Sequence, residues 1–147
     1  MTNGLFHGEL VVTTIDKKGN RFEYITPNTL TGEASRIMSH LLVGDAIGDL
    51  VVNRLAVGTG NTPPVRGDEA LGNEVYQQAI DGYTYPSVGH TEYKTVIDFV
   101  CAANGHVLAE AGLMGANGTS LFARQVHTPI AKDSNFKVEY RWRIVYT

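Results

Sequence analysis

Residues 56–75, AVGTGNTPPVRGDEALGNEV, hold the densest group of residue types in the chain that could do chemistry. Gly58, Thr59 and Gly60 could begin a glycine-rich loop whose backbone amides hold a phosphate. The pattern then fails, because Pro63 stands in the position of the third glycine and no lysine follows as in nucleotide-binding loops. We interpret the stretch as a strand exit followed by an ordered surface connection, in which Gly58 and Gly60 can adopt positive φ.

Within this stretch, Arg66, Gly67 and Asp68 form a tripeptide of the kind that adhesion receptors bind. A three-residue match often occurs by chance, and nothing else in the sequence indicates an extracellular animal protein. We instead expect Asp68 to cap the short segment 69–71.

Two carboxylates, Glu74 and Glu110, are the candidates for general acid–base chemistry. A catalytic pair would need both side chains in one cleft at a suitable separation. In the structural alternative, each carboxylate accepts hydrogen bonds from loop amides or pairs with an arginine such as Arg124. We favour the structural role and expect Glu74 to tie the 56–75 connection back to the sheet.

Metal binding and nucleophilic catalysis have no supporting residue pattern. No two histidines lie two or four positions apart, Cys101 falls on the expected apolar face of a strand, and no Gly-x-Ser-x-Gly motif occurs. The histidines are His7, His40, His90, His106 and His127. We therefore predict a protein that is not an enzyme and needs no metal or cofactor.

The composition predicts one soluble domain whose surface is partly covered by a partner. The chain has 147 residues, of which 43% are hydrophobic and 18% charged, and its net charge is −3. A domain of this length can bury a core without disulfides, and a single cysteine offers no internal disulfide. The low charged fraction indicates a covered surface, and the negative charge argues against nucleic acid. No export signal or membrane-spanning apolar stretch is recognisable.

Hydrophobic periodicity predicts a hairpin and one helix in the first third of the chain. Residues 10–15 and 21–25 flank a turn and predict a β-hairpin. Between Thr31, a candidate N-cap, and Gly44, a candidate C′ residue, helical spacing predicts an amphipathic helix over about 32–43. Its apolar residues are Ala34, Ile37, Met38, Leu41 and Leu42.

Strand signals dominate the rest of the chain. Strands are predicted at 51–57, 93–101, 106–109, 121–126 and 136–146. Asn-Gly turns precede the third and fourth of these strands, and the first such turn suggests a hairpin of 93–101 with 106–109. In 136–146 apolar and charged residues alternate, so one face is packed. Short strands between turns predict a mainly β fold, an antiparallel sandwich or small barrel with one short amphipathic helix. We expect residues 8–147 to form this domain and 1–7 an N-terminal arm.

Several short motifs keep the order that they have in a known group of proteins. They include Asn-Thr-Leu-Thr at 28–31, Val-Gly-Thr-Gly at 57–60, Asp-x-Ala-Leu-x-Asn-Glu-Val at 68–75, Glu-Ala-Gly-Leu-Met at 110–114, Leu-Phe-Ala-Arg at 121–124, Ile-Ala-Lys at 130–132 and Tyr-Arg-Trp-Arg-Ile at 140–144. From about Gly8 to Thr147, the chain resembles a widespread group of tailed-phage virion proteins. Related segments are similar to the N-terminal attachment regions of phage tail-fibre and tail-collar proteins.

The resemblance implies an all-β, jelly-roll-like sandwich that coats or joins parts of the virion and has no catalytic activity. It marks as fold-specifying positions Gly58, Thr59, Gly60, Leu71, Asn73, Glu74, Glu110, Gly112, Leu113, Arg124 and Lys132. In one departure, Gln77 and Gln78 stand where the pattern usually has an arginine. An ion pair of that arginine is therefore not carried over to this chain.

These features together favour a capsid decoration, or cement, protein that stabilises the head shell of a virion. Its expected partners are the major capsid protein or other virion proteins and further copies of itself. Leu5 and Phe6 in the arm, with Tyr83 and Tyr85, are the candidate partner contacts. The alternative is a tail, baseplate or tail-fibre adaptor of the same fold.

A third interpretation is a carbohydrate-binding module, a different class of protein. Tyr83, Tyr85, Tyr93 and Trp142 could stack on sugars. Core packing explains Tyr93 and Trp142 more simply, which leaves Tyr83 and Tyr85 as an exposed pair. A glycan is therefore the less favoured ligand.

Overall fold

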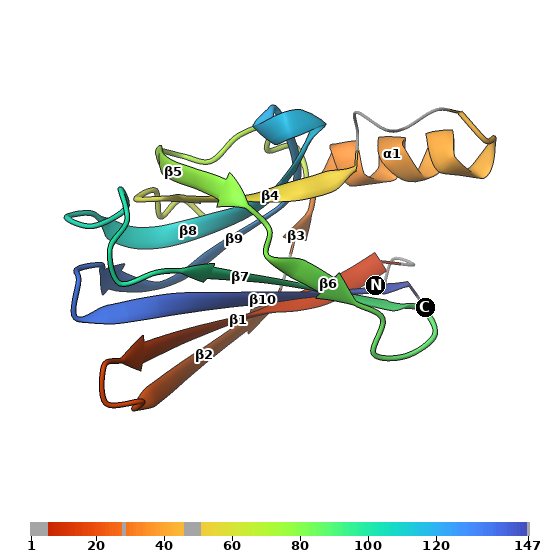
Figure 1. Ribbon diagram of the computed structural model, residues 1–147. Coiled ribbons are helices and arrows are strands. Elements are labelled where there is room, and N and C mark those ends of the chain that lie inside the picture. Colours follow the sequence, from red (N-terminus) through yellow and green to blue (C-terminus); the bar gives the residue numbers. More distant parts are fainter. Residues whose placement is uncertain (1–5, 28, 46–50, 147) are drawn as a thin grey trace.

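The computed structural model describes residues 6–27, 29–45 and 51–146, which form two five-stranded antiparallel sheets and one α-helix. Sheet A contains, in spatial order, β2 (Arg21–Pro27), β1 (Phe6–Asp16), β10 (Phe136–Tyr146), β7 (His90–Ile97) and β6 (Gly82–Thr84). Sheet B contains β3 (Thr29–Leu30), β9 (Ser120–Ala131), β8 (Val107–Gly115), β4 (Val52–Gly58) and β5 (Glu74–Ala79). The sheets are the two layers of a sandwich, and α1 (Gly32–Leu42) extends past one end of them (Figure 1).

The hairpin predicted near the N-terminus is confirmed, since β1 and β2 pair antiparallel. On its other side β1 pairs with β10 over its whole length, from Phe6 opposite Tyr146 to Asp16 opposite Phe136. The arm expected at residues 1–7 is thereby shortened, because Phe6 and the residue after it already belong to sheet A. Residues 1–5 lie outside the described residues.

The hydrophobic core lies between the two sheets. The alternation predicted for 136–146 is confirmed, because Val138, Tyr140, Trp142 and Ile144 are at most 1% exposed. Sheet B and α1 contribute Leu55, Val57, Leu108, Ala111, Leu113, Ala34 and Ile37 to the same core. The interior is therefore filled by inward-facing side chains of both layers, as expected for a sandwich.

Helix α1 forms where the sequence predicts it, but only part of its apolar face is covered. Ala34 and Ile37 are buried, whereas Leu41 and Leu42 are 51% and 81% exposed because the helix runs past the ends of the sheets (Figure 1). The predicted end is confirmed: Gly44 has φ +78° and its N–H donates to the carbonyl of Leu41 at 3.1 Å.

The two Asn-Gly turns have different outcomes. Asn117-Gly118, with φ 56° and 94°, joins β8 to β9 within sheet B, as a hairpin turn should. The predicted hairpin of 93–101 with 106–109 is wrong, since β7 lies in sheet A and β8 in sheet B. Both edges of β7 are already paired, with β10 and β6, so the chain crosses to the other layer through residues 98–106.

The sandwich is thus established, while the jelly-roll connectivity is not confirmed. A jelly roll consists of eight strands in two Greek keys. Here each sheet has five strands, and the chain neighbours β1–β2 and β8–β9 pair directly as hairpins.

Candidate functional site

Glu110 fixes the connection between β4 and β5, and its side chain is 0% exposed. Strand β8 carries this carboxylate to the 59–73 segment. Oε2 accepts hydrogen bonds from the backbone N–H groups of Gly60 and Asn73, and Oε1 accepts one from Gly72, each at 2.7 Å. One carboxylate therefore holds both ends of the connection.

Arg124 on β9 completes the cluster with a side chain that is only 3% exposed. Its Nε donates to Glu110 Oε1 at 3.0 Å and its Nη1 to Asp68 Oδ2 at 3.0 Å. Its Nη2 donates to the carbonyl of Thr62 at 2.9 Å. We call Glu110, Arg124 and the bound residues of 60–73 the Glu110 clasp, because they fasten the connection at its ends and in its middle.

The glycines around the clasp are required by close approach. A Cβ on Gly58 would lie 2.6 Å from Glu110 Oε2, and a Cβ on Gly60 would meet the same oxygen more closely still. Gly112 faces Leu121 in the same manner, at 2.8 Å. Gly58 and Gly60 do not have positive φ, so that expectation is wrong. At Gly58 the carbonyl oxygen of Asn73 and the Glu110 carboxylate leave no space for a side chain, and at Gly60 the same carboxylate leaves none.

The hydrogen bonds of the clasp keep Glu110 ionised. Burial raises the pKa of this carboxyl group, but the three amides and Arg124 outweigh burial and hold the pKa below its usual value. A general acid needs a raised pKa and access to substrate, and Glu110 has neither. The geometry therefore supports the structural role for Glu110.

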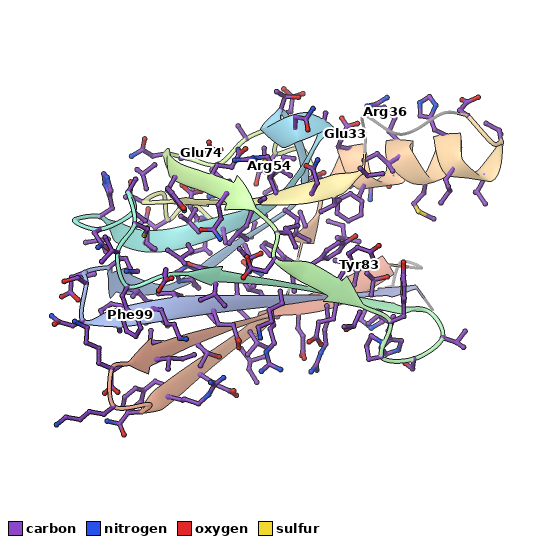
Figure 2. The ribbon with its side chains drawn as sticks, viewed as in Figure 1. Glu33, Arg36, Arg54, Glu74, Tyr83 and Phe99 are labelled. Atoms are coloured by element: carbon purple, nitrogen blue, oxygen red, sulfur yellow. The ribbon has the colours of Figure 1, made fainter. Side chains whose placement is uncertain are left out.

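Glu74 takes no part in the clasp through its side chain. It begins β5, is exposed, and among the described residues its carboxylate accepts a hydrogen bond only from Gln77 Nε2, at 3.3 Å. The expectation that Glu74 ties the connection to the sheet is wrong for the carboxylate, because Glu110 fills that role and Glu74 faces solvent (Figure 2). The backbone returns to the sheet here, since Glu74 pairs with Gly58. Asn73 fastens the return, with its Nδ2 donating to Thr59 Oγ1 at 2.7 Å.

The glutamines that replace the expected arginine have partners of their own. Gln77 accepts a hydrogen bond from Arg54 Nε at 2.5 Å, so an arginine is supplied from β4 instead. Gln78 donates from Nε2 to the carbonyl of Val96 at 3.0 Å, which links the edge of sheet B to sheet A.

Lys132 fixes the crossover between the sheets, and the residue is 2% exposed. Its Nζ donates to Asn104 Oδ1 at 2.7 Å and to the carbonyls of Asp133 and Phe99 at 2.8 and 3.3 Å. Burial lowers the pKa of Lys132. Since Phe99 and Asn104 belong to segment 98–106, this ammonium group does for the crossover what Glu110 does for the 59–73 segment.

His127 and Tyr140 join the two sheets inside the core. The Tyr140 hydroxyl lies 3.0 Å from His127 Nε2, and His127 Nδ1 lies 2.8 Å from the carbonyl oxygen of Thr128. Because a carbonyl can only accept, Nδ1 carries the proton and Nε2 accepts from the tyrosine. Burial lowers the pKa of His127 and raises that of Tyr140, so both groups are neutral.

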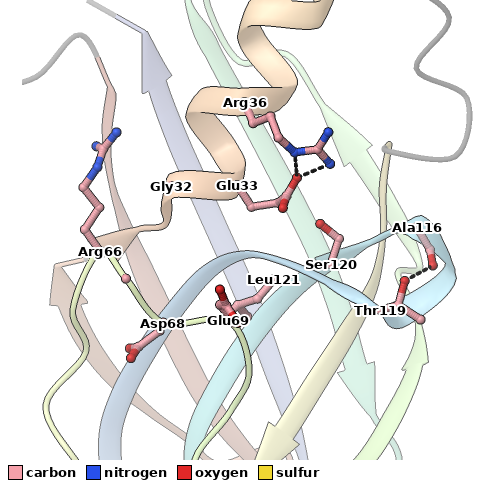
Figure 3. Close-up of a pocket in the computed structure, with 11 residues that line it drawn as sticks. Gly32, Glu33, Arg36, Arg66, Asp68, Glu69, Ala116, Thr119, Ser120 and Leu121 are labelled. Carbon is pink, nitrogen blue, oxygen red and sulfur yellow. Dashed lines mark hydrogen bonds and ion pairs between the residues drawn. The ribbon is translucent and has the colours of Figure 1, made fainter.

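The charged side chains of the Arg-Gly-Asp tripeptide are bound to other parts of the chain. Arg66 Nη2 donates to Ser35 Oγ at 2.8 Å, while Asp68 is paired with Arg124. Arg66 and Asp68 point in different directions from their loop (Figure 3). A receptor would have to take Asp68 away from a buried arginine, so the adhesion interpretation has no support in the geometry.

The expectation that Asp68 caps the segment 69–71 is wrong. Residues 69–71 form no helix. The carboxylate Oδ2 instead accepts the backbone N–H of Val65 at 3.0 Å and closes a turn, in addition to its ion pair with Arg124.

A polar cleft of about 600 Å³ lies beside this loop, between the start of α1 and the turn η2 (Ala116–Gly118) (Figure 3). Its charged lining has both signs: Arg36 pairs with Glu33, and Arg66, Asp68 and Glu69 also line the cleft. A lining that carries both charges does not select a ligand of one charge. The cleft therefore carries no ligand prediction.

An apolar groove of about 600 Å³ lies at the end of the sandwich where α1 projects. It is lined by Ile37, Met38, Leu41, Val51, Val52, Asn53, Tyr83, Tyr85, Thr91, Tyr93 and Phe122. Tyr83 and Tyr85 are 63% and 72% exposed, as the sequence predicted, and their rings meet edge to face with centroids 5.7 Å apart. Figure 2 shows Tyr83 on β6 at this end. Of the other candidate contacts, Leu5 lies outside the described residues and Phe6 is the first residue of β1.

Among residues 6–27, 29–45 and 51–146, no three His, Cys, Asp or Glu residues gather as a metal site. The described part of the chain also contains no helix with the length and hydropathy to cross a bilayer. Comparison with protein-family models, curated proteins and solved structures finds no match. The resemblance to phage virion proteins therefore stays a prediction.

The sequence reasoning missed the contacts of two residues. Thr31 is the N-cap residue of α1, as predicted, but its hydroxyl donates to the carbonyls of Leu121 and Phe122 and so ties the start of α1 to β9. The sequence indicates no role for His127, but this residue is buried, with 6% of its surface exposed. Its signal was a polar residue at an inward position of a strand, where it must find a partner in the opposite sheet.

Proposed function

We propose that this chain is a non-enzymatic structural protein of a tailed-phage virion, and specifically a capsid decoration protein that stabilises the head shell. The motif residues that carry the resemblance support this proposal. Gly58, Gly60, Asn73, Glu110 and Arg124 all take part in the Glu110 clasp or pack against it. The shared motifs thus have a fold-specifying explanation that requires no catalysis.

The observation that carries the proposal is the apolar surface at the α1 end of the sandwich. Leu41 and Val51, which line the groove with Tyr83 and Tyr85, are 51% and 46% exposed, and Leu42, which follows Leu41, is 81% exposed. Monomeric proteins rarely leave large contiguous apolar patches open to water. A neighbouring virion subunit is the proposed cover for this surface.

The rigid connections suit such a role. The Glu110 clasp and Lys132 hold the 59–73 and 98–106 segments in place before any partner binds. Neither segment lines the groove, so they stabilise the sandwich that carries the proposed contact surface and are not part of that surface. Weak contacts that are repeated over a capsid lattice then add up to a large avidity.

The direct test is binding of the purified protein to expanded capsid shells that lack it. The native protein should co-sediment with the shells, and Leu42→Lys should weaken binding by at least about tenfold, since it places a charge in the proposed contact. Val100→Lys is the matched control, because Val100 is 82% exposed but lies on the 98–106 crossover. Native protein that fails to bind shells would overturn the proposal.

The alternative is a tail, baseplate or tail-fibre adaptor. The groove lies at one end of the sandwich and not on a broad sheet face, which suits an end-on contact between successive parts (Figure 1). Copy number separates the two functions. Quantitative mass spectrometry against the major capsid protein should give a simple lattice fraction for a decoration protein and a few to a few tens of copies for an adaptor.

A carbohydrate-binding function has less support. Trp142 is 1% exposed and offers no open ring face, and Tyr93 is partly buried against the core. Tyr83 and Tyr85 are inclined by 70° to each other and do not form one flat platform for a sugar. Binding on a glycan array would reverse this ranking.

A further inference from the structure

Strand β2 is an open edge of sheet A. Among the strands that the structure describes, none pairs with the outer side of β2. Phe22 and Ile25 are each 65% exposed, and all of the seven residues except Thr26 are exposed. An open edge presents backbone N–H and C=O groups that can pair with another strand.

The other sheet edges are shorter or irregular. At the far side of sheet A, β6 has three residues, and in sheet B β3 has two. The remaining edge, β5, has a register shift against β4. By contrast, β2 pairs with β1 without a bulge, contains no lysine, and has its proline only at the last position, Pro27. Apart from the charges of Arg21 and Glu23 and the terminal Pro27, β2 therefore has none of the usual devices that block edge pairing.

The closing hydrogen bonds of the β1–β2 turn show which backbone groups face outward. The N–H of Asp16 donates to the carbonyl of Asn20 at 3.0 Å. Because inward and outward groups alternate along an antiparallel strand, the N–H and C=O groups of Arg21, Glu23 and Ile25 point away from β1. These groups are free to pair with a new strand, and its register decides which of the three residues take part.

The charges on β2 are complementary to a second copy of the same strand. In an antiparallel pair with its twofold axis at Phe22, Arg21 lies opposite Glu23 of the second copy, and Glu23 lies opposite its Arg21. Both residues are hydrogen-bonding positions of the outer edge, and Phe22 faces Phe22. A shift by one pair would put Glu23 opposite Glu23, and a further shift would put Arg21 opposite Pro27, which has no N–H.

We propose that two copies of this chain associate through the outer edges of their β2 strands, in the register that pairs Arg21 with Glu23. The two A sheets then become one continuous ten-stranded sheet. Arg21 and Glu23 are available for this contact, since their side chains are 50% and 46% exposed and make only 3.5 Å ion pairs within the chain. The dimer does not depend on the proposed virion function, because it follows from the strand edge alone.

The test is sedimentation equilibrium of the full chain over a wide concentration range. Native protein should change from monomer to dimer as concentration rises. Arg21→Glu and Glu23→Arg should each raise the dissociation constant by at least about tenfold, because each places two like-charge pairs across the edge. An equimolar mixture of the two variants should recover dimers, since an acidic edge then meets a basic one.

Controls separate the interface from folding. Lys94→Glu reverses a charge on the same face of sheet A, on β7, and should leave dimerisation unchanged. Circular dichroism and urea unfolding should show that both single variants are folded. A native chain that stays monomeric, single variants that still dimerise, or a mixture that fails to recover dimers would each overturn the proposal.

Discussion

Strand β4 connects two regions with opposite chemistry. Its last residue, Gly58, packs against Glu110, whose carboxylate is buried and bound by three amides and an arginine. Its first residue, Val52, lines the apolar groove, where Tyr83 and Leu41 are more than half exposed. Polar groups are thus buried and bonded at one end of β4, and apolar groups are open to water at the other.

The difference separates folding from association. Buried ions that are fully hydrogen-bonded hold one backbone arrangement, and removing one partner leaves the others unpaired in a low dielectric. Exposed apolar side chains contribute little to folding and become useful when another surface covers them. Substitutions in the Glu110 clasp should therefore lower the free energy of unfolding, whereas substitutions in the groove should change binding.

The largest effect is expected for Glu110→Gln. This substitution keeps the shape but removes the charge that Arg124 pairs with, and it turns one acceptor into an amide donor that faces backbone N–H groups. The free energy of unfolding should fall by about 3–5 kcal/mol, the typical cost of breaking a buried ion pair. Urea unfolding followed by circular dichroism measures it.

Glu74→Gln is the matched control, because it makes the same chemical change on an exposed side chain. Its effect should stay within about 0.5 kcal/mol. Similar losses for both variants would contradict the assignment of the buried carboxylate as the residue that holds the connection.

A smaller loss is expected for Gly60→Ala. The new methyl group would collide with Glu110 Oε2 and force the clasp to shift, which should cost about 1–3 kcal/mol. Gly67→Ala is the control, since a Cβ there meets nothing within 4 Å and the residue does not have positive φ. Equal unfolding midpoints for the two variants would show that the 59–73 segment is looser than the hydrogen bonds indicate.

The sequence was sufficient for local elements and insufficient for the pairing of distant ones. The β1–β2 hairpin, α1 and β10 follow from periodicity and turn residues, which are properties of neighbouring residues. The assignment of β7 and β8 to one hairpin failed because a tight Asn-Gly turn looks the same whether the next strand joins the same sheet or the opposite one. Only the competition of β6 and β10 for the edges of β7 decides this, and it involves long-range contacts.

The sequence predicted the kind of cluster that holds the 59–73 segment, but it did not predict which glutamate belongs to that cluster. The sequence indicated a carboxylate that accepts loop amides and pairs with Arg124, and Glu110 does so. It could not exclude Glu74, because both glutamates lie next to small or polar residues, and burial distinguishes them only once β8 lies under the 59–73 segment. The reason for glycine at position 58 was likewise hidden, since the colliding atoms are the carbonyl oxygen of Asn73 and the carboxylate of Glu110, both distant in sequence.

Acid titration should separate the contribution of the His127–Tyr140 pair to stability from that of the Glu110 clasp. The lowered pKa of His127 means that the unfolded chain binds a proton below the usual value of 6.5 while the folded chain does not, so stability falls as pH drops through that range. Glu110 also has a lowered pKa, and its contribution is present above 4.5 and lost only at lower pH. Urea unfolding midpoints measured between pH 8 and 3 should show both declines in stability. The substitution His127→Gln should remove the decline that occurs at the higher pH. An unchanged upper decline would mean that another group causes it.

The smallest effect on folding is expected for Leu42→Lys at the groove end. Leu42 is 81% exposed at the last position of α1, where a lysine also interacts favourably with the helix dipole. The free energy of unfolding should change by no more than about 0.5 kcal/mol, although the same substitution is expected to weaken partner binding. Ile37→Val, one buried methylene less on the same helix, should cost about 0.5–1.5 kcal/mol in the same assay. If Leu42→Lys cost more than Ile37→Val, the exposed end of α1 would belong to the folding core, and the contrast between the two ends of β4 would disappear.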